Sequence, residues 1–380
     1  MTDYDLYDLL TDLSRQMTLE DCFKLSLTSK RNNDLLYYTS SITSDDICLD
    51  CSHDIEELEP IDLSKFRHLV IIDIDEEYKI DDISIFQSLK SIDLFYITET
   101  SDISGISKLT NLTRLHADYY GKELDIKQLT QIEDLSLSHT KCISHIDHLT
   151  GLIKLDLEKN DIIASISKFR SLTSLSLAYN STIKIIPSYI HLIELNLDGN
   201  KIMNHVSKFV NLTSLILGGN TKICKIETLT KLRTLGLKGN RTITNKQLIP
   251  LTNLTDLDLD YNTKITNIDH LVGLKRLVTN NLMDNEELSY LTNLTELDLG
   301  NNDVITKIPH FRYLVKLVMN GNKTVKYISN PETLTSLNIC DCTIKFDLKS
   351  FINLKELFIN NNTLMNRRDW QFTKKIKRVI

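Results

Sequence analysis

The stretch that decides the fold runs from residue 172 to residue 240. It contains LTSLSLAYN (172–180), LIELNLDGN (192–200), LTSLILGGN (212–220) and LRTLGLKGN (232–240). Each segment fits L-x-x-L-x-L-x-x-N, and successive first leucines are 20 residues apart. The series continues from Leu254 to Leu354 and extends back to Leu69, which makes fifteen repeats. A period of this length is typical of a solenoid, which grows by adding units to a continuous core.

The spacing of the leucines predicts the structure of each repeat. In L-x-L, alternate side chains point to opposite faces, so we expect a short strand with buried leucines in a parallel sheet. The asparagine turns the chain, and its amide should bond backbone groups of the loop and of the next repeat. Twenty residues leave little room for a long helix, so the second half should be extended or single-turn 3₁₀ structure.

The pattern resembles the leucine-rich-repeat family. The ninth position is Asn in nine repeats, and Cys342 stands there in a tenth. The resemblance implies an α/β solenoid with a curved parallel sheet on its concave side. Two repeats depart from the pattern, at 112–120 with Ala117 and at 274–282 with Thr279, and we expect local irregularity there.

The N-terminal segment has a different spacing. Between residues 5 and 38, Leu6, Leu9, Leu10 and Leu13 recur at helical intervals, which predicts a small helical head. The stretch MTLEDCFKLSLTSKR (17–31) resembles the F-box, although the family's initial Leu-Pro is absent and Asn32 replaces a common Trp. The resemblance implies docking on a Skp-type adaptor of a cullin-type ubiquitin ligase. The docking residues would be Leu19, Asp21, Leu25 and Leu27. The alternative is a plain cap that covers the first repeat.

These patterns divide the chain into four parts. We expect a head at 1–42, a transition with a degenerate repeat at 43–68, a solenoid at 69–366, and a basic cap or tail at 367–380. Charge is uneven along the chain, because residues 1–100 hold 23 acidic and 8 basic side chains. That end should repel nucleic acid and acidic membranes.

The outward positions around L-x-L should form one continuous face. Acidic side chains outnumber basic ones there, and tyrosines are interspersed. We expect this face to hold a basic protein or peptide, because aromatic anchors and complementary charge favour such a partner. The candidate residues are Asp156, Glu158, Tyr179, Asp198, Asp256, Asp258, Asp260, Tyr261 and Asp298. The alternative is that the acids serve solubility alone.

Metal and catalytic chemistry find little support in the sequence. No nucleophile, phosphate-loop or metalloprotease motif occurs, so we expect no enzyme activity and no cofactor. Asp256, Asp258 and Asp260 form a row that calcium could bind, but a solvated acidic face is the favoured interpretation. Cys48, Cys51 and His53 lack a fourth zinc ligand, so no metal site is predicted.

The expected location is the cytoplasm or the nucleus. The acidic start MTDYDLYDLL lacks the features of a secretory signal, and no apolar run approaches the ~18 residues that span a bilayer. The expected function is therefore non-enzymatic protein binding without nucleic acid or membrane partners. An F-box-like adaptor is the first hypothesis. A free-standing scaffold, inhibitor or regulatory subunit is the alternative.

Overall fold

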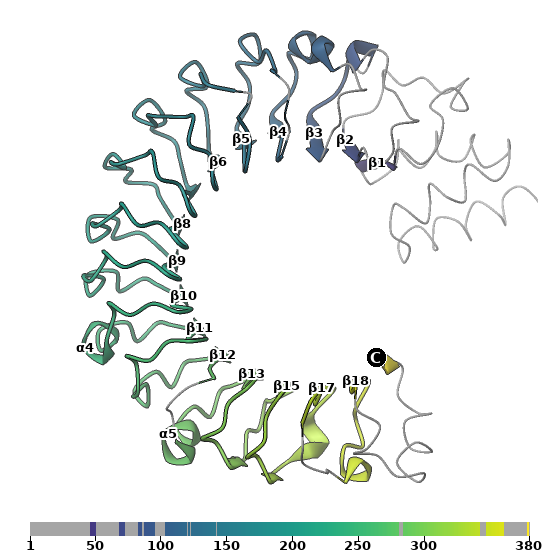
Figure 1. The fold of residues 1–380 in the computed structure, drawn as a ribbon, viewed down its shortest axis with the longest axis vertical. Coiled ribbons are helices and arrows are strands. Elements are labelled where there is room, and N and C mark those ends of the chain that lie inside the picture. The colour runs from purple at the N-terminus through teal and green to yellow at the C-terminus, as the bar shows by residue number, and fades with distance from the viewer. Residues whose placement is uncertain are drawn as a thin grey trace, which may run out of the picture. The chain divides into compact units, whose positions relative to one another are not determined.

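The computed structural model describes residues 46–50, 68–72, 83–95 except 86, 103–360 except 120, 122, 142, 281–283 and 343–346, and 378–379. The predicted head and its four docking residues lie outside these ranges, as do Cys51 and His53. The chain divides into two compact units, Met1–Tyr189 (unit 1) and Ile190–Ile380 (unit 2). Each unit is a stack of parallel strands (Figure 1).

Unit 1 contains seven described strands. They are β1 (Asp46–Asp50), β2 (His68–Ile72), β3 (Ser91–Phe95), β4 (Arg114–His116), β5 (Asp134–Ser136), β6 (Lys154–Asp156) and β7 (Ser174–Ser176). Each strand pairs in parallel with the strand before it. Leu115, Leu135 and Leu155 lie opposite one another in this register, so the central leucines form one buried row.

Unit 2 continues the same arrangement. Its main sheet contains β8 (Glu194–Asn196), β9 (Ser214–Ile216), β10 (Thr234–Gly236), β11 (Asp256–Asp258), β12 (Arg276–Val278), β13 (Glu296–Asp298), β15 (Lys316–Val318), β17 (Ser336–Asn338), β18 (Glu356–Phe358) and β19 (Arg378–Val379). All pair in parallel in chain order. Two residues of the basic segment 367–380 therefore add a strand beside β18.

The side opposite the strands consists mainly of turns. Short 3₁₀ helices occur at Ile83–Ile85, Ser104–Lys108, Pro331–Thr333 and Leu348–Ser350, as the repeat length predicts. The expectation was incomplete, because α4 (Asn245–Leu248) and α5 (Asn285–Ser289) are short α-helices and β14 (Lys307–Ile308) pairs with β16 (Tyr327–Ile328). Asp284 starts α5 by accepting hydrogen bonds from the backbone N–H groups of Glu286 and Glu287.

The core tolerates the two irregular repeats. Ala117 and Thr279 occupy leucine positions, and both are buried. Larger rings enter the core from the turn side, since Phe169, Phe311 and Phe351 are fully buried. The smaller side chains at positions 117 and 279 leave the stacking of the strands intact, because β4 and β12 each pair in register with the strands on both sides.

The buried asparagines form a hydrogen-bonded ladder. Asn160 donates from Nδ2 to the carbonyl oxygens of Leu137 and Thr140, each at 3.0 Å. Its Oδ1 accepts the N–H groups of Ile162 and Ile163 in its own loop, each at 3.1 Å. The predicted role is correct for the loop, but the amide reaches the preceding repeat and not the next one. The preceding repeat supplies both acceptors, the carbonyl oxygens of Leu137 and Thr140.

Candidate functional site

The outward positions of the repeats form what we call the strand face. It consists of positions three, five, seven and eight, counted from the first leucine of each repeat in residues 112–180 and 192–360. Positions three and five lie on the strands, and positions seven and eight lie in the turn that follows. All nine predicted partner-binding residues occupy this face.

The side chain at position five stabilises the turn that follows the strand. The Oδ1 atoms of Asp156, Asp258 and Asp298 each accept the backbone N–H of the residue two positions later, at 2.8 Å. Asn196 and Asn338 make the same bond at 3.0 Å. This is the local hydrogen bonding that Asp and Asn offer to a turn. Three predicted binding acids therefore also have a structural role.

Burial raises the pKa of these same carboxyl groups. Desolvation is the main cause for Asp156, Asp258 and Asp298, and neighbouring carboxylates add to it. Asp118 and Glu158 repel Asp156, while Asp260 repels both Asp258 and Asp298. Neither Asp258 nor Asp298 forms an ion pair with a described residue. The charged form of these carboxyl groups therefore lowers the stability of the fold, and a basic partner could form ion pairs with Asp258 and Asp298.

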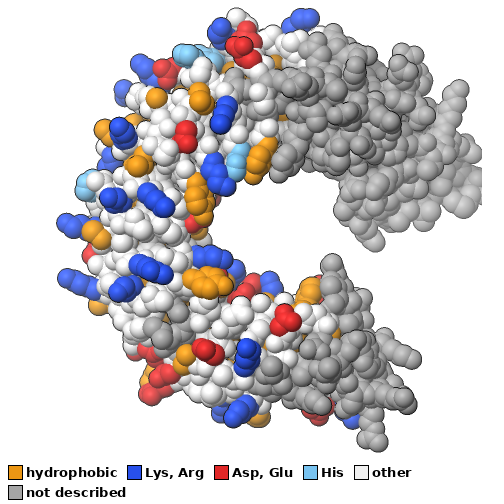
Figure 2. All heavy atoms as spheres, in the orientation of Figure 1, with side chains coloured by type: hydrophobic (Ala, Val, Ile, Leu, Met, Phe, Trp, Pro, Cys, Tyr) orange, Lys and Arg blue, Asp and Glu red, His pale blue; other side chains and the backbone are white. Residues whose placement is uncertain are grey.

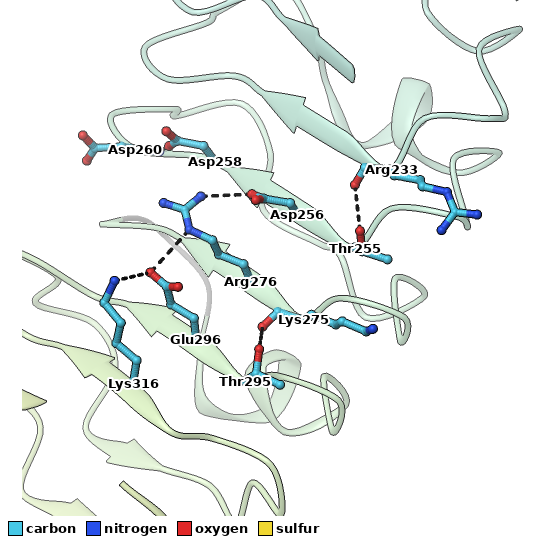
Figure 3. A network of polar contacts seen from close by, with 10 residues as sticks. All are labelled: Arg233, Thr255, Asp256, Asp258, Asp260, Lys275, Arg276, Thr295, Glu296 and Lys316. Carbon is cyan, nitrogen blue, oxygen red and sulfur yellow. Dashed lines mark hydrogen bonds and ion pairs between the residues drawn. The ribbon is translucent and has the colours of Figure 1, made fainter. Parts of the chain in front are cut away.

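Position three of unit 2 carries a ladder of alternating charge. Arg276 Nη1 lies 3.0 Å from Asp256 Oδ1, and Arg276 Nε lies 3.4 Å from Glu296 Oε1. Lys316 Nζ lies 2.8 Å from the same Glu296 oxygen (Figure 3). The pairs form because adjacent parallel strands lie only about 4.8 Å apart. Asp256 is therefore neutralised within the chain.

Position eight has an unusual backbone conformation. Its φ angles lie between +50° and +69° in eleven described repeats, in the left-handed region that favours glycine. Glycine fills four of these positions. The other seven are Tyr119, His139, Lys159, Tyr179, Tyr261, Asn301 and Asp341. Several large side chains thus occupy a position whose backbone conformation favours glycine.

The tyrosines at position eight contact nitrogen-bearing side chains. The rings of Tyr119 and His139 stack with centroids 4.1 Å apart. Lys159 Nζ lies 5.2 Å from the ring centroid of Tyr179, and Lys238 Nζ lies 5.7 Å from that of Tyr261. Lys238 Nζ is also 2.8 Å from Asp260 Oδ2, and this hydrogen bond raises the pKa of Lys238.

Charge differs between the two parts of the strand face. In unit 2, nine acidic side chains stand against three basic ones, whereas in unit 1 four stand against three. Figure 2 shows further acidic side chains near α5, but these lie on the side opposite the strands and are not counted here. The excess of acid on the strand face therefore belongs to unit 2.

The structure brings together some predicted residues and adds others. Asp156 and Glu158 share a turn, and Asp256, Asp258 and Asp260 lie around Arg276 (Figure 3). The strand face also holds His139 and Lys159, which the sequence pattern does not single out, and Arg276 pairs with neighbours that the pattern did not assign to it. The pairing had a signal, because acid and base alternate at 20-residue spacing from residue 256 to residue 316.

The described residues include no group of three or more His, Cys, Asp or Glu side chains placed to hold a metal ion. Asp256 and Asp260 of the predicted row are engaged by Arg276 and Lys238. A search of the described helices for one long and apolar enough to cross a membrane finds none.

Comparisons with known proteins address the fold. No family model and no curated protein matches the chain. The solved leucine-rich-repeat protein LIC12759 of Leptospira interrogans is 21% identical, with a TM-score of 0.52, over 85% of this chain and 91% of that one. The functional domain of InlJ from Listeria monocytogenes is 20% identical, with a TM-score of 0.50, over 73% and 69%. Stacked parallel strands, the asparagine ladder and these two similarities together identify a leucine-rich-repeat fold.

Proposed function

We propose that this chain is a non-enzymatic protein-binding scaffold whose strand face holds a basic partner. The observation that carries the proposal is the exposure of Tyr119, Tyr179 and Tyr261 at position eight, with 43%, 49% and 58% of each residue accessible. A left-handed backbone costs a non-glycine residue about 1 kcal/mol. Glycine fills the same position in four repeats without that cost, so the turn itself does not require a tyrosine.

Exposed rings add little to the fold and much to an interface. Aromatic side chains supply a large share of binding energy at protein interfaces. Nine acids against three bases leave an excess of six on the unit 2 strand face, and this excess complements a basic surface and would speed its association. The same excess of acid disfavours a nucleic acid backbone.

A peptide library tests this function. Full-length protein would select from a phage-displayed library of random 12-residue peptides, and we expect enrichment of peptides that contain Lys or Arg. Tyr179→Asn and Tyr261→Asn should weaken the selected peptides about tenfold, because each removes an anchoring ring. Asparagine suits the backbone there, since Asn301 adopts the same conformation.

Tyr290→Asn is the matched control. Tyr290 is 49% exposed at the end of α5, away from the strand face, so its loss should leave the peptides bound. Selection of acidic peptides, or equal weakening by all three variants, would contradict the proposal. The adaptor role is a narrower version of it and rests on the sequence of residues 1–42 alone.

A further inference from the structure

A nitrogen-bearing side chain covers each of the three position-eight tyrosines. His139 lies on Tyr119 with the two ring planes at 19°. Lys159 covers Tyr179 and Lys238 covers Tyr261. The arrangement occurs in both units, on repeats with different neighbouring sequences. It is therefore a recurrent property of this strand face.

A carboxylate completes each arrangement. Glu158 Oε1 lies 3.7 Å from His139 Nε2 and 4.0 Å from Lys159 Nζ. In unit 2, Asp260 Oδ2 lies 2.8 Å from Lys238 Nζ. A ring and a carboxylate that converge on one cation are the components of an ammonium or guanidinium site. The chain's own lysines occupy two such sites.

These lysines are easily displaced. The side chains of Lys159 and Lys238 are 46% and 61% exposed, and ion pairs at such sites are weak. The ammonium group is also strongly hydrated and behaves as a point charge. A planar guanidinium can instead stack on the ring and donate two hydrogen bonds to the carboxylate. The stacked ring of His139 shows that a flat nitrogen-bearing group fits on a tyrosine here.

We propose that Tyr179 with Glu158, and Tyr261 with Asp260, are binding sites for arginine side chains of a protein partner, and that Lys159 and Lys238 occupy them until the partner arrives. This inference rests on the proposed function and names the chemistry of the partner. It also predicts that the two lysines limit the affinity of the scaffold. Removing either one should therefore strengthen binding.

A defined peptide tests the inference. The full chain labelled with 3-fluorotyrosine would be titrated with acetyl-GGRGRGG-amide and followed by fluorine NMR, with Tyr179→Asn and Tyr261→Asn assigning the two signals. We expect both signals to shift. Lys159→Met should lower the Kd read at Tyr179 about three- to tenfold, and Lys238→Met should do the same at Tyr261, because methionine keeps the stem and vacates the site. The lysine peptide acetyl-GGKGKGG-amide should bind more weakly.

Two control variants separate site occupancy from overall charge. Lys154→Met removes a charge from the same face without uncovering a ring. Lys307→Met uncovers Tyr327, over which Lys307 lies at 5.5 Å in the β14–β16 pair, where no described carboxylate forms an ion pair with it. Neither control should tighten binding at Tyr179 or Tyr261.

The outcomes are distinct. Tighter binding in Lys159→Met and Lys238→Met alone supports the inference. Unchanged or weaker binding in both, or equal tightening in Lys154→Met, overturns it. If library peptides bind the strand face but the arginine peptide moves neither tyrosine signal, the arginine sites are wrong and the scaffold function stands.

Discussion

Asn240 donates a hydrogen bond from Nδ2 to the carbonyl oxygen of Asn220, one repeat earlier, at 3.1 Å. The same amide donates to Leu217 at 2.9 Å and accepts the N–H groups of Thr242 and Ile243 at 2.9 and 3.0 Å. One buried side chain thus satisfies four backbone groups. Repeats are joined by these amides as well as by the strands.

Asn240→Ala should therefore lower the free energy of unfolding by about 3 kcal/mol, since it leaves several buried backbone groups without a hydrogen-bond partner. Asn240→Cys should cost less, because Cys342 at the same position places Sγ 2.9 Å from the carbonyl oxygen of Met319. Urea unfolding followed by circular dichroism measures both. Equal losses for alanine and cysteine would mean that the thiol replaces none of the lost hydrogen bonds.

The energetic cost of the left-handed backbone at position eight can be measured without changing any side-chain contact. A Cβ added at Gly239, where φ is +61°, meets nothing within 4 Å. Gly239→Ala should still destabilise the protein by about 1 kcal/mol, from backbone strain alone. Gly121→Ala is the matched control, because Gly121 is equally open and lacks a left-handed φ. It should be neutral or slightly stabilising, and an equal loss at both sites would remove strain as the explanation.

The position-five acids should make stability fall as pH rises. Burial raises the pKa of Asp258 and Asp298 in the folded protein above the ordinary value of 3.8. Between that value and the raised pKa, the folded state binds more protons than the unfolded state. Asp258→Asn and Asp298→Asn keep the turn, as Asn196 and Asn338 do, and should raise stability at pH 7. Melting temperatures from pH 3 to pH 7 measure the effect.

Asp161 provides a comparison of opposite sign. Hydrogen bonds from the backbone and hydroxyl of Ser181 lower the pKa of Asp161. Its charge therefore stabilises the fold above pH 3.8, and this contribution is lost as pH falls through the lowered pKa. Asp161→Asn should reduce stability at pH 7. A gain in stability for all three substitutions would show that removing net charge, and not the local environment, is responsible.

The charge ladder should contribute modestly to stability. Arg276→Met breaks its contacts with Asp256 and Glu296 and should cost about 1 kcal/mol at low salt. The loss should shrink in 1 M NaCl, where screening is strong. The double variant Asp256→Asn with Arg276→Met should recover part of the loss, because no unpaired acid remains at position 256. A salt-independent loss would point to packing by the arginine stem.

The F-box-like head makes a separate prediction. Full-length protein should recover Skp and cullin subunits in a pull-down, and a version lacking residues 1–40 should not. Circular dichroism of the truncated protein shows whether it still folds. If soluble full-length protein recovers neither subunit, the adaptor hypothesis is wrong and the cap remains. Leu25→Asp and Leu27→Asp in the full chain provide variants that keep the segment in place.

The repeat, its strands and the burial of its leucines could be predicted from residues alone, because their period is regular over fifteen repeats. The direction of the asparagine bonds could not, since position 160 is equally close in sequence to both neighbouring repeats. α5 follows from Asp284 and Glu287, a capping pair visible in the sequence. The expectation of only extended or single-turn 3₁₀ structure in the second half of each repeat did not include it.

The candidate site was predictable in outline. The repeat pattern placed Asp258 and Tyr261 on one face, but it says nothing of the backbone conformation in the turn. The only sequence signal for the left-handed φ at position eight is the glycine found there in four repeats. The other seven repeats have Tyr, His, Lys, Asn or Asp at this position. The contacts of Lys159 with Tyr179 and of Lys238 with Tyr261 depend on that backbone, so they could not be predicted.

The asparagine ladder also gives the stack a direction. In six repeats the asparagine Nδ2 donates to carbonyl oxygens of the repeat before, as Asn160 does to those of Leu137 and Thr140. Loss of a repeat on the N-terminal side leaves asparagine amide donors without acceptors, whereas loss on the C-terminal side leaves backbone N–H groups such as those of Leu157 and Lys159 without theirs. Fraying should therefore break side-chain hydrogen bonds at one end and backbone hydrogen bonds alone at the other, although the repeats are nearly alike.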